Sequence, residues 1–314
     1  MKTPQSRRDF LRVSAAGALG AFALSQVGCK NPAPAPVSVP EPVDPRSFGI
    51  GLQLYTIRDA MTTDVPGSLK KVSDMGYKYL ELASYADGKF YNYTPEEFKM
   101  IVTDLGMEIL SSHTQVEARG ITLDNATKMA EDHAKLGVKY CVQPWVVEEA
   151  RTTVSSYKKM VAEWNKVGKI MKEHGIQFGY HNHNFEFTPV EGKIPYYDIF
   201  MAEMDKDLIT MEIDLFWVTK AGQNPVDIFN KYPGRFQLFH MKDMYTQEAP
   251  YYTTDGVTDF APVGAGIINF KEILAAKNVA GMKYMFVEQD STKDGKPFDA
   301  LLTSITNLTT KILV

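Results

Sequence analysis

The sequence predicts an α/β protein whose main part is a (β/α)8 TIM barrel, preceded by an export signal and a Pro/Ala-rich linker. A unit of amphipathic helix, glycine and short strand recurs from Phe48 onward and supplies eight strand segments. Nearly every ionisable residue of these segments lies in the C-terminal half of its strand. A doubly wound sheet is the alternative, but no Gly-x-Gly-x-x-Gly follows the first strand segment to form its nucleotide site.

The repeat gives the expected strands in order. A glycine such as Gly76 ends the helix ahead of six of the strands, because glycine adopts the left-handed conformation at low cost. The eight expected strands are Gly49–Tyr55, Lys78–Ser84, Met107–Thr114, Val138–Trp145, Ile176–His183, Ile209–Val218, Phe236–Asp243 and Lys283–Asp290.

Helices are expected between these strands. The clearest start is at Thr94, which can cap the helix, with Pro95 at the first helical position and Glu97 placed to complete a capping box. The segment Ser156–His174 is long and amphipathic, and its apolar side chains at three- and four-residue steps indicate core packing.

The N-terminal region predicts export. Residues 1–28 resemble a twin-arginine signal, with Arg7 and Arg8 ahead of a short apolar run, and Cys29 stands where a lipoprotein would carry its lipid. Residues 29–47 form an expected flexible linker, and residues 48–314 form the barrel. The alternative is a disordered basic tail with a chance cysteine. We therefore expect an exported protein, either periplasmic or tethered to a membrane only through a lipid anchor.

The net charge and the cysteine content of the chain argue against nucleic-acid binding and against a disulfide framework. The chain carries a formal charge of −4, and because residues 1–28 contribute a net +3, the remainder carries −7. This negative charge argues against a basic surface of the kind that binds nucleic acid. The two cysteines, Cys29 and Cys141, lie in unlike contexts and do not indicate a disulfide framework.

The segment Gly175–Phe187 carries the densest cluster of chemically active residues. His181 and His183 lie two positions apart on an expected strand, so they point to the same face, and Glu186 is expected within reach of that side. Two imidazoles and a carboxylate are costly to bury without a cation or a polar substrate. We therefore expect the reaction centre here.

A metal site is expected at the ends of the last four strands. Its candidate ligands are Glu186, Asp214, His240 and Glu288, whose three carboxylates would repel one another without a cation. Such a set suits one divalent ion, namely Mn2+, Mg2+, Zn2+ or Co2+. Any single strand-end carboxylate is more often a cap or an ion-pair partner, and it is their joint occurrence that favours a site.

Other strand-end residues are candidates for catalysis and binding. Acid, base or orienting roles fall to His113, His181, His183 and Lys242. The candidate substrate contacts are Gln53, Tyr55, Glu81, Trp145 and Trp217, although plain packing explains each aromatic residue equally well. The connection Met244–Ile268 shows no clear helix or strand and is expected to cover the substrate or to be disordered.

At these residues the chain resembles the xylose isomerase-like TIM-barrel sugar (phosphate) isomerase/epimerase superfamily. The resemblance runs from about Phe48 to the C-terminus, and its most specific pieces are Gly49–Arg58, Tyr180–Phe187, Asp214–Trp217, His240–Asp243, Gly264–Phe270 and Val287-Glu288. By that resemblance Asp214, His240 and Glu288 match the metal-binding Asp, His and final Glu. Many members place the first metal-binding Glu inside the fifth strand, where this chain has Tyr180 or His181. A branch similar to inosose dehydratase supplies it a few residues later, which implies Glu186, with His183 as the fallback.

The expected function is that of a metal-dependent isomerase or epimerase acting on a sugar or keto-sugar. It would proceed through an enediolate formed by proton abstraction next to a carbonyl. A keto-sugar or glycoside lyase or dehydratase on the same scaffold is one alternative. A non-catalytic, tethered sugar-binding lipoprotein is the other.

Overall fold

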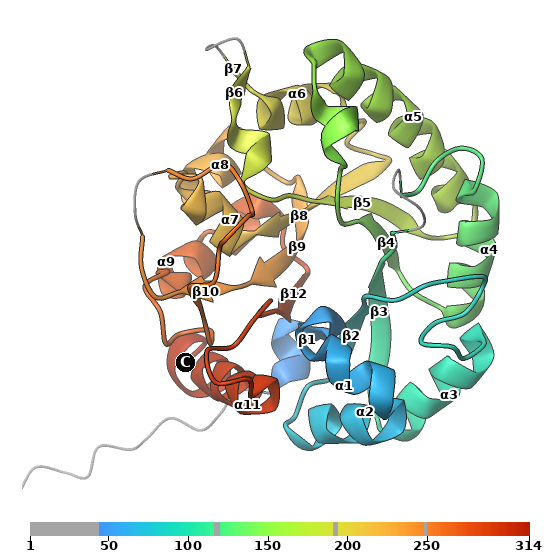
Figure 1. The fold of residues 1–314 in the computed structure, drawn as a ribbon, viewed down its shortest axis with the longest axis vertical. Coiled ribbons are helices and arrows are strands. Elements are labelled where there is room, and N and C mark those ends of the chain that lie inside the picture. Colours follow the sequence, from blue (N-terminus) through green and yellow to red (C-terminus); the bar gives the residue numbers. More distant parts are fainter. Residues whose placement is uncertain (1–43, 116–119, 191–193, 248–249) are drawn as a thin grey trace, which may run out of the picture. The chain divides into compact units, whose positions relative to one another are not determined.

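The computed structural model describes residues 44–115, 120–190, 194–247 and 250–314. In these residues the chain forms a closed barrel of eight parallel strands, in the spatial order β1-β12-β9-β8-β5-β4-β3-β2 (Figure 1). The strands are β1 Ile50–Gln53, β2 Tyr79–Leu82, β3 Glu108–His113, β4 Tyr140–Gln143, β5 Gln177–His181, β8 Ile209–Asp214, β9 Phe236–Met241 and β12 Tyr284–Val287. The predicted barrel and its eight strands are confirmed. The predicted signal and most of the linker lie outside the described residues.

Helices surround the barrel (Figure 1). They are α1 Arg58–Thr63, α2 Val65–Asp74, α3 Pro95–Asp104, α4 Ala126–Leu136, α5 Val154–Glu173, α6 Tyr196–Glu203, α7 Leu215–Lys220, α8 Pro225–Lys231, α9 Phe270–Ala275, α10 Lys277–Ala280 and α11 Pro297–Asn307. The capping box of Thr94 and Glu97 at the start of α3 is confirmed. None of the described helices is long and apolar enough to cross a membrane.

The sixth barrel strand is shorter than the sequence suggested. It ends at Asp214 rather than Val218, and the next residues form α7. The physical reason is the side chain of Asp214, which accepts a hydrogen bond from the N–H of Trp217 at 3.0 Å and so caps the helix. Trp217 therefore reaches the barrel mouth from a helix.

Two short antiparallel strand pairs were not predicted from the sequence. After β5, β6 (Pro189–Val190) pairs with β7 (Ile194–Pro195), and in the connection after β9, β10 (Asp243–Met244) pairs with β11 (Phe260–Ala261). The carboxylate of Asp243 accepts hydrogen bonds from four backbone N–H groups, those of Met244, Gly264, Gly266 and Ile268. A Cβ atom on Gly266 would lie 2.2 Å from the carbonyl oxygen of Met244, so only glycine fits this junction.

The barrel interior is apolar at one end and polar at the other. One end is filled by a cluster of Leu110, Tyr140, Val142, Leu238 and Phe286. Side chains on a strand alternate, so His240 and Glu288, two residues beyond members of this cluster, face the same interior near the C-terminal strand ends. The register places Asp214 beside His240 and His181 beside Glu212. Polar groups from distant parts of the chain thus meet above an apolar floor.

Candidate metal centre and active site

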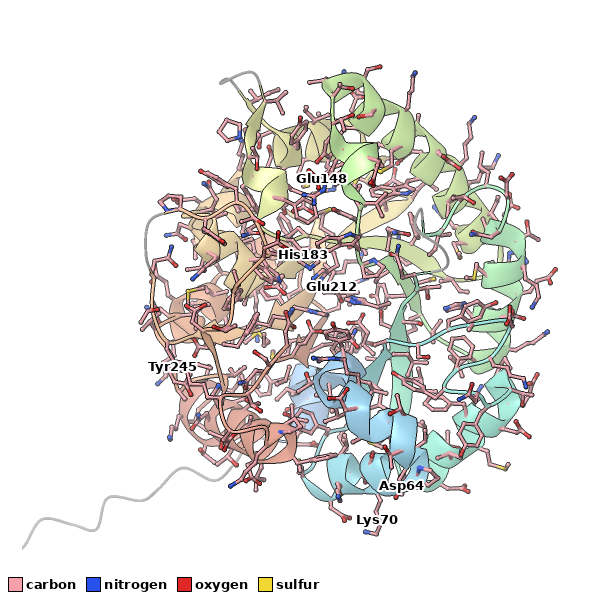
Figure 2. All side chains as sticks on the ribbon, in the orientation of Figure 1. Asp64, Lys70, Glu148, His183, Glu212 and Tyr245 are labelled. Carbon is pink, nitrogen blue, oxygen red and sulfur yellow. The ribbon has the colours of Figure 1, made fainter. Side chains whose placement is uncertain are left out.

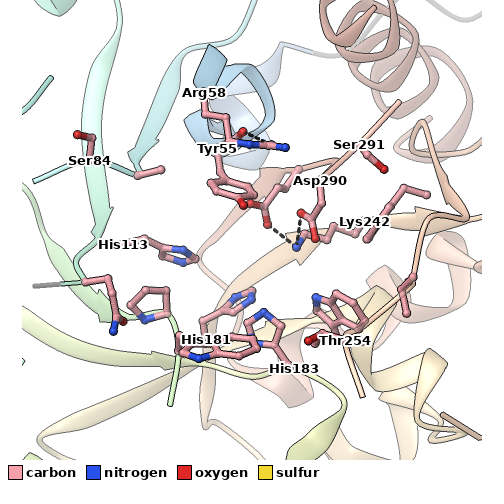
Figure 3. Close-up of a pocket in the computed structure, with 18 of the residues that line it drawn as sticks. Tyr55, Arg58, Ser84, His113, His181, His183, Lys242, Thr254, Asp290 and Ser291 are labelled. Atoms are coloured by element: carbon pink, nitrogen blue, oxygen red, sulfur yellow. Dashed lines mark hydrogen bonds and ion pairs between the residues drawn. The ribbon is translucent and has the colours of Figure 1, made fainter. Parts of the chain in front are cut away.

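A cavity of about 760 Å3 opens at the C-terminal strand ends. It is lined by histidines, aromatic side chains and charged groups from at least five barrel strands or the segments that follow them (Figure 3). The lining residues that bear on function are Tyr55, Arg58, His113, Trp145, His181, His183, Trp217, Lys242, Phe260, Glu288 and Asp290. This is the end of the barrel at which TIM-barrel enzymes place their active sites.

Within the described residues, two groups of side chains bring ligand-capable atoms within 4.8 Å of one another. The outer group consists of Asp214, His240 and Glu288. Nδ1 of His240 lies 2.8 Å from Oε2 of Glu288 and 3.9 Å from Oδ2 of Asp214. That oxygen of Asp214 is buried and makes no hydrogen bond to any residue that the structure describes, and its charge is balanced by the ammonium of Lys242 at 3.2 Å.

The inner group lies deeper in the barrel and consists of His113, His181, Glu212 and His240. Oε2 of Glu212 is 2.5 Å from Nε2 of His113, 3.2 Å from Nε2 of His240 and 3.3 Å from Nδ1 of His181. Figure 2 shows Glu212 near the centre of the barrel. Glu81 adds a second carboxylate, 2.6 Å from Nε2 of His240.

Lys242 supplies a positive charge to the outer group. Its Nζ lies 2.7 Å from Glu288, 2.9 Å from Asp290 and 3.2 Å from Asp214. Lys242 is almost fully buried, and the three carboxylates outweigh the effect of burial and raise its pKa, so it stays charged. Figure 3 shows the ammonium of Lys242 beside the carboxylate of Asp290, with His113 on the other side of the pocket.

Burial and neighbouring charges set the protonation of the acidic ligands. Burial raises the pKa of Asp214 to about 6, an effect that Lys242 and His240 partly offset. Burial would also raise the pKa of Glu288, but the same two cations outweigh it and hold this pKa well below the usual range. At neutral pH both carboxylates are therefore mainly ionised and able to bind a cation.

Most of the predicted site residues meet at the pocket. His113, His181, His183 and Lys242 line it, as do the aromatic residues Tyr55, Trp145 and Trp217. His181 and His183 do face the same side, with ring centroids 4.9 Å apart. Gln53 and Glu81 do not line the cavity: both are buried beneath it, where Nε2 of Gln53 donates to Glu81 at 2.8 Å.

The structure corrects the expected position of Glu186. Strand β5 ends at His181, and the chain then turns into a short 3-10 helix, Phe185–Phe187, which carries Glu186 to the opposite side of the strand. There its carboxylate accepts hydrogen bonds from the hydroxyl of Tyr180 and, at 2.9 Å, from the N–H of His183. Glu186 belongs to neither the inner nor the outer group. His183, the fallback ligand, lines the pocket but belongs to neither group either.

Three residues of the candidate site escaped assignment from sequence. Glu212 was visible as a carboxylate at the end of a strand, yet nothing in the sequence tied it to three histidines. Asp290 ends an expected strand, and in the structure it pairs with Lys242. Arg58 lies at the pocket rim with its guanidinium 4.2 Å from the ring centroid of Tyr55. The Met244–Ile268 connection, expected to cover the substrate or to be disordered, contributes Thr254, Val257, Thr258 and Phe260 to the lining of the pocket.

An eight-stranded parallel barrel with clustered carboxylates and histidines at its C-terminal mouth defines a class of TIM-barrel proteins suited to metal-assisted chemistry. Comparison with known families identifies the family within this class. Residues 69–303 match the model of the xylose isomerase-like TIM barrel, and the chain belongs to that family.

Individual relatives agree with this assignment. A sugar phosphate isomerase/epimerase from Parabacteroides distasonis is 29% identical, with a TM-score of 0.71, and the match covers 84% of this chain and 94% of that one. A xylose isomerase-like barrel from Mycobacterium smegmatis in complex with magnesium is 15% identical, with a TM-score of 0.60, over 87% of this chain and 100% of that one; it shows likeness of fold alone. Inosose dehydratase of Lacticaseibacillus casei is 27% identical over 161 residues, which are 48% of this chain and 53% of that protein. The chain thus matches about half the length of this curated relative.

Proposed function

We propose that the protein is a divalent-metal-dependent enzyme that isomerises or epimerises a sugar or keto-sugar by removing a proton next to a carbonyl group. The observation that carries the proposal is the outer group, whose Glu288 lines the same pocket as His113, His181 and His183. The names of the relatives support a sugar-like substrate. A cavity of about 760 Å3 is large enough for such a molecule.

The residues of the outer group fit a divalent ion. Asp214 and Glu288 offer carboxylate oxygens, and His240 offers Nδ1. These donors are common to sites for Mn2+, Zn2+ and Co2+, and carboxylates also bind Mg2+. When bound, such an ion polarises a carbonyl oxygen of the substrate and makes the neighbouring C–H group more acidic.

His113 and His183 are the candidates for moving the proton, because their surroundings push their pKa values apart. Burial lowers the pKa of His183 well below its usual value, so the ring is neutral and can accept a proton. Burial also acts on His113, but the carboxylates of Glu81 and Glu212 outweigh it and raise this pKa. We therefore assign His183 as base and His113 as acid. The ammonium of Lys242 would stabilise negative charge developing on a substrate oxygen.

A lyase or dehydratase is the second candidate, and the name of the curated relatives favours it. The first step is the same proton abstraction. The outcome differs because a hydroxyl or an aglycone on the adjacent carbon then departs, and the acid His113 can protonate it.

Product analysis in D2O tests both candidates. The purified protein is incubated with added Mn2+, Mg2+, Zn2+ or Co2+ and a panel of oxidised and unoxidised mono- and disaccharides. Deuterium next to a carbonyl in a product with an unchanged carbon and oxygen count supports isomerisation or epimerisation, whereas loss of water or of an aglycone supports the lyase. Sugar binding without either change across the panel would favour a binding protein and contradict the enzymatic proposal.

We further propose that the protein acts outside the cytoplasm. The support is the sequence alone, with Arg7, Arg8 and Cys29 in the pattern of an exported lipoprotein. Replacing both arginines by lysine should retain the protein in the cytoplasm, and Cys29→Ser should release it from the membrane fraction. Cell fractionation with immunoblotting measures both effects.

A further inference from the structure

The rings of His181 and His240 lie between the inner carboxylate, Glu212, and the outer carboxylates of Asp214 and Glu288. In each ring one nitrogen faces the inner carboxylate and the other faces the outer ones. His181 places Nδ1 3.3 Å from Glu212 and Nε2 3.7 Å from Asp214. His240 places Nε2 3.2 Å from Glu212 and Nδ1 2.8 Å from Glu288. The two ring centroids are 4.5 Å apart. Both imidazoles therefore lie between the inner and outer carboxylates; His240 belongs to both groups, and His181 belongs to the inner group with its Nε2 3.7 Å from Asp214 of the outer one.

We propose that His181 is the fourth ligand of the ion, through Nε2, and that Glu212 holds its ring in that orientation. This inference rests on the proposed function, because it concerns the same ion. His181 is 2% exposed and Asp214 is fully buried. Among the described residues, Nδ1 of His181, 3.3 Å from Glu212, makes no hydrogen bond, and Oδ2 of Asp214 makes an ion pair with Lys242 at 3.2 Å but no hydrogen bond. An ion on Nε2 would place a second positive charge beside Asp214, and it would leave the proton on Nδ1 to be donated to Glu212.

Glu212 is placed to orient His181, and it orients His240 together with Glu81, which lies closer to Nε2 of that ring. A metal-binding histidine usually donates its second N–H to a carboxylate, which fixes the tautomer and the plane of the ring. One oxygen of Glu212 lies within 3.3 Å of a nitrogen of both His181 and His240, and 2.5 Å from the candidate acid His113. Glu212 is fully buried, so water cannot easily replace it. It is a positioning residue, acting on the ion and on the proton donor through the imidazoles.

This ligand set favours a transition metal over Mg2+. With His181 the ion has two nitrogen and two oxygen donors, and imidazole suits Zn2+ and Fe2+, whereas Mg2+ prefers oxygen and keeps its water. The charges are also balanced when the ion is bound, because a ligating His240 is neutral. Asp214, Glu288 and Asp290 then carry three negative charges against one positive charge on Lys242, and one divalent ion neutralises the remainder.

Metal binding in the absence of any sugar tests the inference. The full-length protein is titrated with Co2+ and Zn2+ in competition with a chromophoric chelator, and with Mg2+ by calorimetry. The wild type should bind one ion and prefer Co2+ and Zn2+ to Mg2+. His181→Ala should weaken Co2+ binding by about 10- to 100-fold or more and shift the visible absorption of bound Co2+, because a nitrogen donor is lost. His181→Glu should raise the affinity for Mg2+ relative to Co2+.

Matched variants separate the ligand from its neighbours. Glu212→Gln should still bind one ion, about 10- to 100-fold more weakly, with the Co2+ spectrum of a nitrogen-containing site. His183→Ala and Glu186→Gln should keep wild-type affinity for Co2+. Wild-type affinity in His181→Ala, or complete loss of the ion in a folded Glu212→Gln, would overturn the inference and leave the proposed function standing. A wild type that binds no divalent ion would refute the proposed function itself.

Discussion

The backbone N–H of Trp217 donates a 3.0 Å hydrogen bond to Oδ1 of Asp214, which leaves Oδ2 of the same carboxylate turned toward His181 and Lys242. Asp214 therefore has two separable roles, as the cap of α7 and as a candidate ligand. Asn caps helices about as well as Asp but lacks its charge. In Asp214→Asn we expect little change in melting temperature and a loss of Co2+ affinity of at least about 100-fold, the upper end of the losses for outer-shell residues. Calorimetric melting and chelator competition measure the two effects, and unfolding would show that the structural role dominates.

Glu186 should make stability fall as pH rises. Burial raises the pKa of its carboxyl to about 7 from an ordinary value of 4.5, so between these values the folded state holds a proton that the unfolded state has lost. The stabilisation is complete below pH 4.5 and disappears as pH passes 7, an effect of at most about 3 kcal/mol.

In Glu186→Gln the amide can accept from the N–H of His183 and donate to the hydroxyl of Tyr180, so this pH dependence should vanish while the fold remains. Urea denaturation of wild type and variant at pH 5 and pH 8 gives the comparison. An equal stability difference at both pH values would contradict the assigned shift.

His133 should have the opposite effect. This ring is on the buried face of α4; its Nδ1 lies 2.7 Å from the carbonyl oxygen of Met129 and its Nε2 lies 2.8 Å from the hydroxyl of Thr114. Burial lowers its pKa to about 4, so it is neutral when folded. Its contribution to stability is present above about pH 6.5 and is lost as pH falls through 4, by at most about 3 kcal/mol. His133→Gln should be less sensitive to acid than the wild type over this interval, as measured by urea denaturation at pH 7 and pH 4.5.

Asn184 should control the segment that covers the pocket. Its buried Nδ2 donates to the carbonyl oxygens of Tyr251 and Thr253, at 2.9 and 2.7 Å. Two lost hydrogen bonds of about 1 kcal/mol each would loosen this segment in Asn184→Ala. We expect faster hydrogen exchange in residues 250–258 and a higher KM, with kcat changed less. If hydrogen exchange becomes faster only outside residues 250–258, Asn184 does not hold this segment.

The sequence predicted those parts of the site that follow from strand geometry. Asp214, His240 and Glu288 lie at strand ends, and in a closed barrel such ends converge whatever the connecting helices do. His181 and His183 share a face because strand side chains alternate. The alternation ceases where β5 ends, and for this reason the expected position of Glu186 was wrong.

Depth inside the barrel was the other feature that the sequence did not predict. Glu212 and Asp214 lie two residues apart on one strand and point the same way, yet one contacts the inner nitrogens of the histidines and the other the outer. Which nitrogens each carboxylate contacts depends on the register between neighbouring strands. This register pairs His181 with Glu212 and His240 with Asp214. No pattern within a single strand contains this information.

The carboxylate of Asp243 accepts hydrogen bonds from four backbone N–H groups, and these bonds hold together the two ends of the Met244–Ile268 connection. The middle of that segment can therefore change in length and chemistry while His240 and Lys242, just before the junction, stay where they are. Exchanging residues 250–258 among barrels of this family is accordingly a way to change the lining of the pocket while the candidate metal centre stays unaltered.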